Sequence, residues 1–365
     1  MEWQDGAAKV EDGWITVKGR GNAEKAQALF VFGESYADTG NHDRYNQSVN
    51  QPWRRPYGLT WPGYPAGDSL VLPAPTAYEL LKSHDCKSNA KKIRQGVNFA
   101  VEGSGIFEDY GFKTIAQQVK QFKELIGGSQ EFDSHKLSRS LVLISAAVND
   151  YRAFLASRNG SIENIHYFSL CEFITGLKDL VKPVVSGTID AVKELYKSGL
   201  RNFVVSNIDP FGCAPQIGKT SCDSNYDEIL ALHIELLKGA IEILKSDLKE
   251  LSIIISDLVS AINHIFSSPA QFGFVDLFGP CCAAKGRVDM CGEVDQVGRA
   301  LFEVCSNVDE KFFWDSGHPA QRGCHAIMWL YSNGAKGENC SISFIEGAPN
   351  VIEWVESLGF VAYNI

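Results

Sequence analysis

The fold is decided by residues 28–41, which read ALFVFGESYADTGN: an apolar run is followed at once by a glycine and a polar turn. The run Ala28–Phe32 is continuous rather than alternating, as in a strand that is covered on both faces. Four later runs share this character, and they are Gly96–Val101, Leu141–Val148, Phe203–Asn207 and Ile253–Asp257. Segments with helical periodicity lie between the later runs, at Ile115–Ile126, Glu172–Lys197 and Glu228–Glu250. The alternation predicts an α/β fold, a three-layer α/β/α sandwich around a central, mainly five-stranded parallel sheet.

The chain divides into a short N-terminal extension, residues 1–26, and one domain, residues 27–365. A length of 365 residues would also allow two domains. No repeat, low-complexity tract or linker interrupts the sequence, however, and the Pro- and Gly-rich stretch Gln51–Pro75 is typical of a long ordered loop. We therefore expect a single large α/β domain.

The charge balance narrows the classes of partner. The sequence has 34 Lys and Arg against 44 Asp and Glu, for a formal net charge of −10. A nucleic-acid partner is not expected, because binding to phosphates requires clustered cations. Docking on anionic lipid is not supported for the same reason.

No segment predicts a membrane span or an intact signal peptide. The longest apolar stretches, such as Ser140–Val148 and Leu251–Ser256, have the length of a strand. Residues 1–26 carry mixed charge and lack a long apolar stretch. The protein is therefore either intracellular, or secreted with its signal already removed. The glycosylation sequons at Asn46, Asn159 and Asn339 fit secretion, but about this number is expected by chance.

A candidate nucleophile follows the first apolar run. Ligands of open parallel sheets bind beyond the carboxyl ends of the strands, and Ser35 lies there, after Gly33. A serine hydroxyl needs an adjacent base that a third group orients. The loop Trp314–Pro319 supplies Asp315 and His318, at a spacing that lets the carboxylate reach Nδ1 and leaves Nε2 free. The alternative to a catalytic role is that Ser35 is an ordinary turn residue and that Asp315 and His318 form a surface pair.

Ester chemistry on a serine also needs hydrogen-bond donors for the oxyanion, and the loss of one donor typically costs about 3 kcal/mol. The candidates follow three of the apolar runs: the backbone N–H of Ser35, the backbone N–H of Gly103 and the side-chain amide of Asn149. Asn149 and Asp150 also fit an Asx turn at the end of a strand. Such a site requires neither a metal nor an organic cofactor.

Four segments, in this order, resemble the sequence blocks of the plant GDSL esterase/lipases, which belong to the SGNH hydrolase superfamily. They are Phe30–Asn41, Gly96–Ser104, Ile144–Tyr151 and Phe313–His318 with Pro319 and Gln321. The similarity in layout spans roughly residues 27–335. It implies Ser35 as nucleophile, His318 as general base and then general acid, and Asp315 as the residue that orients His318. It further implies an oxyanion hole formed by Ser35, Gly103 and Asn149.

The sequence departs from the family pattern at several positions. Glu34 replaces the family's namesake Asp, Glu102 replaces the first Gly of the second block, and Ala147-Val148 stands where a Gly is usual. The two glutamates either form a carboxylate pair near the site or have hydrogen-bonded or surface roles. The segment Gly67-Asp68-Ser69-Leu70 spells the family name, but Ser69 follows no buried strand. We expect Ser35, not Ser69, to be the nucleophile.

Other side chains beside the predicted nucleophile have alternative roles. Tyr36 and Trp314 either shape the acyl or alcohol pocket or belong to the core. Asp38 and Asn41 are expected to fix the turn through backbone hydrogen bonds rather than to react.

Seven of the ten cysteines lie between residues 213 and 324. No Cys-x-x-Cys pair or close histidine supports a zinc site, and Cys213 and Cys222 are spaced for a local disulfide. The run that includes Cys281, Cys282 and Cys291 resembles the cysteine-rich segment before the last block of the plant family, where disulfides are expected. The resemblance therefore implies a secreted protein or another oxidising compartment.

The sequence thus predicts a serine esterase or lipase that hydrolyses a small-molecule carboxylic ester through an acyl-enzyme on Ser35. An acyltransferase that passes the acyl group to an acceptor alcohol would use the same triad. A non-catalytic binding or defence protein on the same fold is the alternative from another class. No cofactor, nucleic acid or transmembrane segment is expected in any of these cases.

Overall fold

A computed structural model describes the residues 26–41, 56–57, 75–82, 93–107, 111–157, 167–218, 220–286, 291–336 and 341–358. Within these residues the main sheet has seven strands in the order β13-β6-β5-β4-β1-β3-β2. The strands are β1 (Leu29–Gly33), β2 (Thr76–Ala77), β3 (Gly96–Asn98), β4 (Leu141–Ser145), β5 (Asn202–Ser206), β6 (Ser252–Ser256) and β13 (Ile345–Glu346). Neighbouring strands pair in parallel except for β13, which runs antiparallel to β6.

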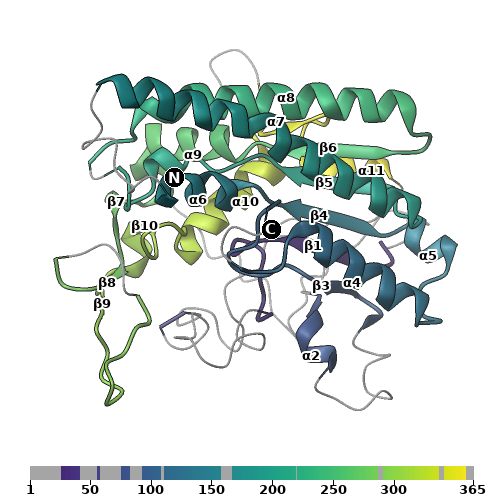
Figure 1. Cartoon of the computed structure of the whole chain (residues 1–365), viewed down its shortest axis with the longest axis horizontal. Helices are drawn as coiled ribbons and strands as arrows, with labels where there is room; N and C mark the ends of the chain where they lie inside the picture. Colours follow the sequence, from purple (N-terminus) through teal and green to yellow (C-terminus); the bar gives the residue numbers. More distant parts are fainter. Residues whose placement is uncertain are drawn as a thin grey trace.

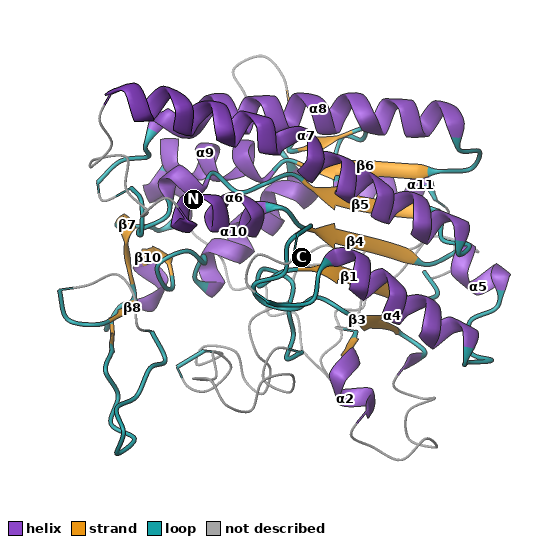
Figure 2. Cartoon of the chain, viewed as in Figure 1, coloured by secondary structure: helices purple, strands orange, loops and turns teal. Residues whose placement is uncertain are grey.

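Helices cover both faces of this sheet, as Figures 1 and 2 show. One face carries α4 (Ile115–Gly127), α6 (Val148–Ser157), α7 (Tyr167–Lys197) and α8 (Asp227–Asp247). The other carries α9 (Leu258–Ser267), α10 (Gln321–Asn333) and α11 (Val351–Ser357). The chain therefore folds as the predicted three-layer α/β/α sandwich.

The continuous apolar runs of the sequence explain the two faces. Along β1, Phe30 and Phe32 point into the core under α4 and α7, whereas Leu29 and Val31 point into the core under α9 and α10. The strand β1 thus buries both of its faces, which is why its sequence shows no polar alternation. The helix α4 is closed at its start by a capping box between Thr114 and Gln117.

Smaller elements surround the sandwich. They are α2 (Tyr78–Lys82), α5 (Ser134–Ser138), β7 (Asp276–Pro280) paired with β10 (Lys311–Phe313), β8 (Cys282–Ala283) paired with β9 (Glu303–Val304), and β11 (Ala335–Lys336) paired with β12 (Ser341–Ile342). The pair β7–β10 leads directly into the loop that carries Asp315 and His318, and α10 follows that loop.

The structure corrects two boundaries and extends the sheet. The run Leu141–Val148 does not form one strand, because β4 ends at Ser145 and α6 begins at Val148. Asn149 and Asp150 therefore lie in the first turn of a helix and not in an Asx turn at the end of a strand. The five predicted strands form the middle of the sheet, and the short strands β2 and β13 extend its two edges.

Candidate active site

The candidate site lies where the order of the strands reverses. The chain passes from β1 to β3 on one side of β1 and then to β4 on the other. Such a reversal leaves a crevice at the carboxyl ends of the strands. Ser35 follows β1, Gly103 follows β3 and Asn149 follows β4, so the topology brings these three residues to one edge of the sheet.

The turn after β1 is fixed by its own polar side chains. Asp38 is fully buried, and its Oδ1 accepts hydrogen bonds from the backbone N–H groups of Gly40 (2.8 Å) and Asn41 (2.7 Å). The Asn41 side-chain amide donates to the carbonyls of Asn98 (2.9 Å), the last residue of β3, and of Ala100 (2.8 Å), just after that strand. The prediction that Asp38 and Asn41 hold this turn is confirmed.

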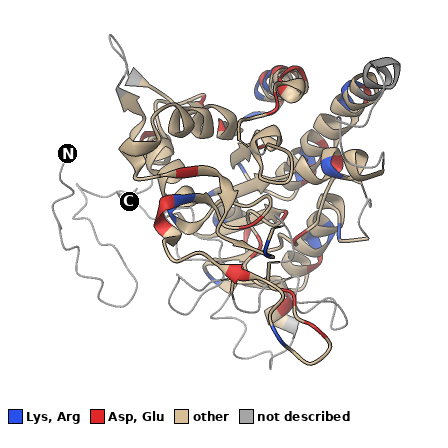
Figure 3. Ribbon diagram, turned by 90° about the vertical axis from the view of Figure 1, so that its left-hand side faces the viewer, with Lys and Arg blue, Asp and Glu red and all other residues tan. Residues whose placement is uncertain are grey.

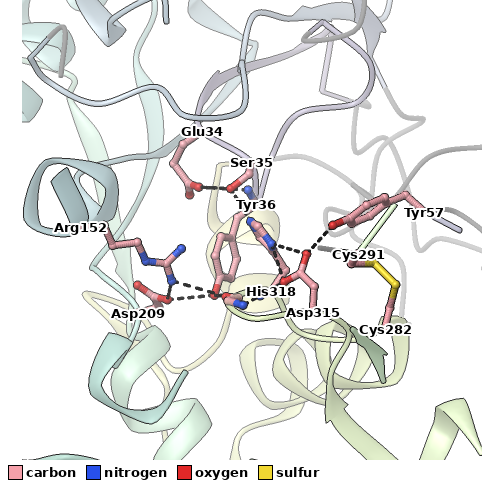
Figure 4. A network of polar contacts seen from close by, with 11 residues as sticks. Glu34, Ser35, Tyr36, Tyr57, Arg152, Asp209, Cys282, Cys291, Asp315 and His318 are labelled. Atoms are coloured by element: carbon pink, nitrogen blue, oxygen red, sulfur yellow. Dashed lines mark hydrogen bonds and ion pairs between the residues drawn. A yellow bond between two sulfur atoms is a disulfide. The ribbon is translucent and has the colours of Figure 1, made fainter. Parts of the chain in front are cut away.

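The loop after β10 brings a histidine and an aspartate to the serine (Figure 4). His318 Nε2 lies 2.7 Å from Ser35 Oγ, and His318 Nδ1 lies 2.9 Å from both carboxylate oxygens of Asp315. Asp315 Oδ1 also accepts hydrogen bonds from the backbone N–H groups of Gly317 (2.9 Å) and His318 (2.8 Å). The carboxylate therefore fixes both the imidazole ring and the loop that carries it.

Burial and charge set the protonation of this pair. Burial alone would lower the pKa of His318, but the facing charge and hydrogen bond of Asp315 outweigh it and raise the pKa to about 9. Burial acts to raise the pKa of Asp315, whereas the charge of His318 and the hydrogen bonds to the carboxylate hold it well below its usual range. Asp315 is thus an anion that stabilises a protonated His318.

Tyr57 is a partner of this site that the sequence analysis missed. Its hydroxyl donates a 2.8 Å hydrogen bond to Oδ2 of Asp315. Burial, together with the charge of Asp315, raises the pKa of the Tyr57 hydroxyl far above its usual value, so the group stays a donor. Tyr57 belongs to the Pro-rich stretch that we expected to be an ordered loop, and no motif in the sequence connects it to Asp315.

A buried ion pair lies on the opposite side of the loop that carries Asp315 and His318. Arg152 of α6 lies 3.0 Å from Oδ2 of Asp209, which follows β5. The Tyr36 hydroxyl lies 3.0 Å from the same carboxylate oxygen and 3.1 Å from the carbonyl of Gly317. Figure 4 shows this group beside His318. Burial and the charge of Asp209 raise the pKa of Tyr36, which keeps its hydroxyl protonated.

The loop after β3 contains a glycine in the left-handed backbone conformation. Gly103 has φ +75°, and a Cβ at this position would lie 2.2 Å from the ring of Phe112. Asp150 fixes the same loop, because its carboxylate accepts the N–H groups of Ile106 (2.9 Å) and Phe107 (2.9 Å). Within the described residues, the backbone N–H groups of Ser35 and Gly103 have no hydrogen-bond acceptor.

Asn149 completes this arrangement from α6. Its side chain is buried, and one of its amide N–H groups donates to the carbonyl of Ser104 at 2.9 Å. A side-chain amide carries two N–H groups, so one further donor remains. The three residues predicted from the sequence as donors therefore lie after β1, after β3 and in the first turn of α6, at the same edge of the sheet.

Glu34 is buried beside the serine rather than exposed at the surface. Its side chain is 2% exposed. The Ser35 hydroxyl lies 2.9 Å from its Oε2, and the Ser145 hydroxyl donates to its Oε1 at 3.0 Å. Of the alternatives that the sequence left open, the hydrogen-bonded role is the correct one.

The two flanking aromatic residues have different environments. Tyr36 lines a mainly apolar pocket between the sheet and α10, together with Leu143, Val204 and Met328. Trp314 is buried and packs against Tyr57, with ring centroids 6.3 Å apart. Tyr36 therefore borders a pocket, whereas Trp314 belongs to a core.

Disulfides lie next to the loop that carries Asp315 and His318. The described residues contain the pairs Cys213–Cys222, Cys281–Cys305 and Cys282–Cys291, and the first confirms the predicted local bridge. The backbone N–H groups of Cys281 and Cys282 donate to the carbonyls of Phe313 (3.0 Å) and Trp314 (2.6 Å), immediately before Asp315. These cysteines therefore brace the segment that positions Asp315.

Charged residues of both signs are spread over the part of the chain that the structure describes. Figure 3 shows Lys and Arg interspersed with Asp and Glu along the helices. Among the described residues, no group of three or more His, Cys, Asp or Glu is placed to bind a metal ion. In the same part of the chain, no helix combines the length and the apolar character that crossing a membrane requires.

Several predictions fall on residues that the structure does not describe. Ser69 lies outside the described residues, as do the sequons at Asn46, Asn159 and Asn339. The N-terminal extension, residues 1–26, is likewise outside them apart from Ala26.

Comparisons with known proteins place the chain in a family. The profile of the family described as GDSL-like Lipase/Acylhydrolase matches residues 29–328. A GDSL esterase/lipase of Arabidopsis thaliana is 29% identical over 321 residues, which cover 82% of this chain and 84% of that protein. A second Arabidopsis GDSL esterase/lipase is 31% identical over 329 residues, or 84% of this chain and 86% of that one. A solved variant of an acetyl xylan esterase from Geobacillus stearothermophilus aligns with 84% of this chain and 93% of its own, at 11% identity and a TM-score of 0.33. The chain therefore belongs to the GDSL-like lipase/acylhydrolase family.

Proposed function

We propose that this protein hydrolyses small-molecule carboxylic esters through an acyl-enzyme on Ser35. The observation that carries this proposal is the continuous chain of polar contacts from Ser35 Oγ to His318 Nε2 (2.7 Å) and from His318 Nδ1 to Asp315 (2.9 Å). A nucleophile, a base and an orienting carboxylate in this order are what activation of a serine requires.

The reaction then proceeds in two halves. Ser35 Oγ attacks the ester carbonyl carbon while its proton moves to Nε2 of a neutral His318, and the protonated His318 returns that proton to the leaving alcohol. Water then attacks the acyl-enzyme while His318 takes a proton from it, and the protonated His318 returns that proton to Ser35 Oγ as the bond to the acyl carbon breaks and the acid is released. The backbone N–H groups of Ser35 and Gly103 and the amide of Asn149 stabilise the oxyanion in each half.

The family supports ester hydrolysis as the type of reaction. The matched profile is described as a lipase/acylhydrolase, and both Arabidopsis relatives are described as esterase/lipases.

The three disulfides of the described residues fit an oxidising compartment. The plant relatives fit the same compartment. We propose secretion on this basis.

Labelling with a fluorophosphonate tests the nucleophile. We expect wild-type protein to be labelled and hydrolyse a chromogenic ester, and both signals to disappear in Ser35→Ala and in His318→Ala. Ser69→Ala is the matched control, because Ser69 lies in the Gly-Asp-Ser-Leu segment, and it should retain labelling. Wild-type protein that is not labelled would contradict the proposal and favour the non-catalytic binding or defence protein.

The fate of the acyl group separates hydrolysis from transfer. In this experiment the protein is incubated with an ester in the presence and absence of candidate alcohols, and free acid and new ester are both measured. Free acid as the main product supports the hydrolase. New ester as the main product would instead identify an acyltransferase that uses the same triad.

A further inference from the structure

The Ser35 hydroxyl lies between two groups that can both accept its proton (Figure 4). On one side His318 Nε2 is 2.7 Å from Oγ, and on the other Glu34 Oε2 is 2.9 Å from it. A hydroxyl carries one proton, so it can donate to only one of these partners at a time. The direction of that single hydrogen bond therefore decides whether His318 is in position to receive the proton during attack.

Three groups of the site lie within hydrogen-bond distance of the Glu34 carboxyl group. Besides Ser35, it accepts hydrogen bonds from the Ser145 hydroxyl at Oε1 (3.0 Å) and from the backbone N–H of Tyr36 at Oε2 (3.2 Å). Its own backbone N–H donates to the carbonyl of Ser145 at 3.1 Å. The end of β4 and the turn after β1 therefore hold the carboxyl group directly against the nucleophile.

When Glu34 is ionised, one arrangement places every proton in this site. Asp315 accepts Nδ1–H of a protonated His318, Nε2–H of His318 donates to Ser35 Oγ, and the Ser35 hydroxyl donates to Glu34. Hydrogen bonds to an ionised carboxylate are stronger than those between neutral groups. In this arrangement His318 cannot act as a base, because its Nε2 already carries a proton.

We propose that Glu34 restrains the nucleophile: its carboxylate takes the hydrogen bond of the Ser35 hydroxyl away from His318 and, by its charge, favours the protonated form of His318. This inference rests on the proposed function, in which Ser35 attacks and His318 accepts the proton. Attack requires the other arrangement, in which the Ser35 O–H bond points to a neutral His318 and its proton passes to Nε2 as the Oγ–carbon bond forms.

Other charges face Glu34 from the surrounding elements. Asp209, after β5, and His318, in the catalytic loop, act on it with opposite signs. Arg152 of α6 is a further neighbouring charge, and it is paired with Asp209 at 3.0 Å. Burial outweighs the hydrogen bonds from Tyr36 and Ser35, so the pKa of Glu34 lies above its usual value. The balance between its charged and neutral forms is therefore set inside the site.

The variant Glu34→Gln tests this proposal, because an amide has nearly the same shape and cannot ionise. We measure the second-order rate of fluorophosphonate labelling as a function of pH for wild type and variant. The wild-type rate should rise with pH as His318 loses its proton. In Glu34→Gln the rising part of the plot of labelling rate against pH should move to lower pH by about one unit. Labelling near pH 7 would then be about tenfold faster.

Ser145→Ala is the second variant, and it keeps the carboxyl group. Removing the donor to Oε1 makes the charge of Glu34 less stable, so Glu34 is neutral over a wider range of pH. The rising limb should move in the same direction as in Glu34→Gln, but by less. Thermal unfolding of each variant shows whether it is folded at the assay temperature, and Ser35→Ala gives the labelling background.

An unchanged pH profile in both variants would overturn the proposal and leave Glu34 with a structural role. A folded Glu34→Gln that labels at least tenfold more slowly at every pH would also overturn it, because the carboxylate would then assist the attack. Wild-type protein that resists labelling at every pH would refute the proposed function itself. The two failures are therefore distinguishable.

Discussion

The hydroxyl of Tyr57 donates a 2.8 Å hydrogen bond to Oδ2 of Asp315, although the two residues are 258 positions apart in the chain. His318 Nδ1 lies 2.9 Å from both oxygens of the same carboxylate. Tyr57 therefore contributes directly to the orientation of the proposed base.

Tyr57→Phe removes this donor and keeps the ring that packs against Trp314. We expect the pKa of Asp315 to move up toward its usual value, because one hydrogen bond to the carboxylate is lost. The carboxylate should then hold His318 less firmly, and kcat/KM for an ester should fall by about three- to tenfold. An unchanged kcat/KM would mean that Tyr57 does not contribute to the orientation of His318.

The ion pair of His318 and Asp315 couples stability to pH. The pKa of His318 is raised from 6.5 to about 9 in the folded protein, so the folded state binds this proton more tightly than the unfolded state. The stabilisation is complete below pH 6.5 and is lost as the pH rises through about 9.

Urea unfolding at a series of pH values measures this effect, with His318→Gln as the variant that cannot titrate. We expect the free energy of unfolding of wild type to fall more steeply with rising pH than that of the variant, by on the order of 2 kcal/mol. Two parallel curves would show that the ion pair does not stabilise the fold.

Gly103 and Gly111 form a matched pair, because both have positive φ, +75° and +71°. A Cβ at Gly103 would lie 2.2 Å from the ring of Phe112, whereas a Cβ at Gly111 would meet nothing within 4 Å. Gly111→Ala should therefore cost only the backbone strain, about 1 kcal/mol of unfolding free energy.

Gly103→Ala should cost more than Gly111→Ala, and it should also displace an oxyanion donor. We expect fluorophosphonate labelling to slow by at least about tenfold in Gly103→Ala and to remain near wild type in Gly111→Ala. Equal labelling by the two variants would remove Gly103 from the proposed oxyanion hole.

Ala147 is strained in the native backbone. It has φ +98° and lies immediately before α6. Because glycine adopts positive φ freely, Ala147→Gly should relieve this strain and partly offset the loss of a buried methyl group. Ala146→Gly is the control, since Ala146 is also buried and is not among the residues with positive φ.

We expect Ala147→Gly to be more stable than Ala146→Gly by about 1 kcal/mol in urea unfolding. The reverse order would show that packing of the Ala147 methyl group outweighs the strain. Because Ala147 directly precedes the helix turn that carries Asn149, the labelling rate of each variant should be measured alongside its stability.

The three-layer sandwich could be predicted because strands that are buried on both faces have continuous apolar runs in the sequence. The runs around Phe30, Val142 and Ile253 contain consecutive apolar residues, as strands covered on both faces require. The edge strands β2 and β13 were not predictable, since each spans two residues and neither has a pattern of its own. The end of β4 was placed too late, because Val148, the first residue of α6, continues the apolar run of that strand.

By itself, the sequence determined the layers of the fold and the candidate residues Ser35, Asp315 and His318, because their signals are local: apolar runs, a turn after a strand and an Asp-x-x-His spacing. Only the tertiary structure decided which groups surround them. The contacts of Glu34 with Ser145 and of Tyr57 with Asp315 join distant segments of the chain. Such contacts, and the pKa of each buried group, depend on the path of the folded chain, which local sequence patterns do not encode.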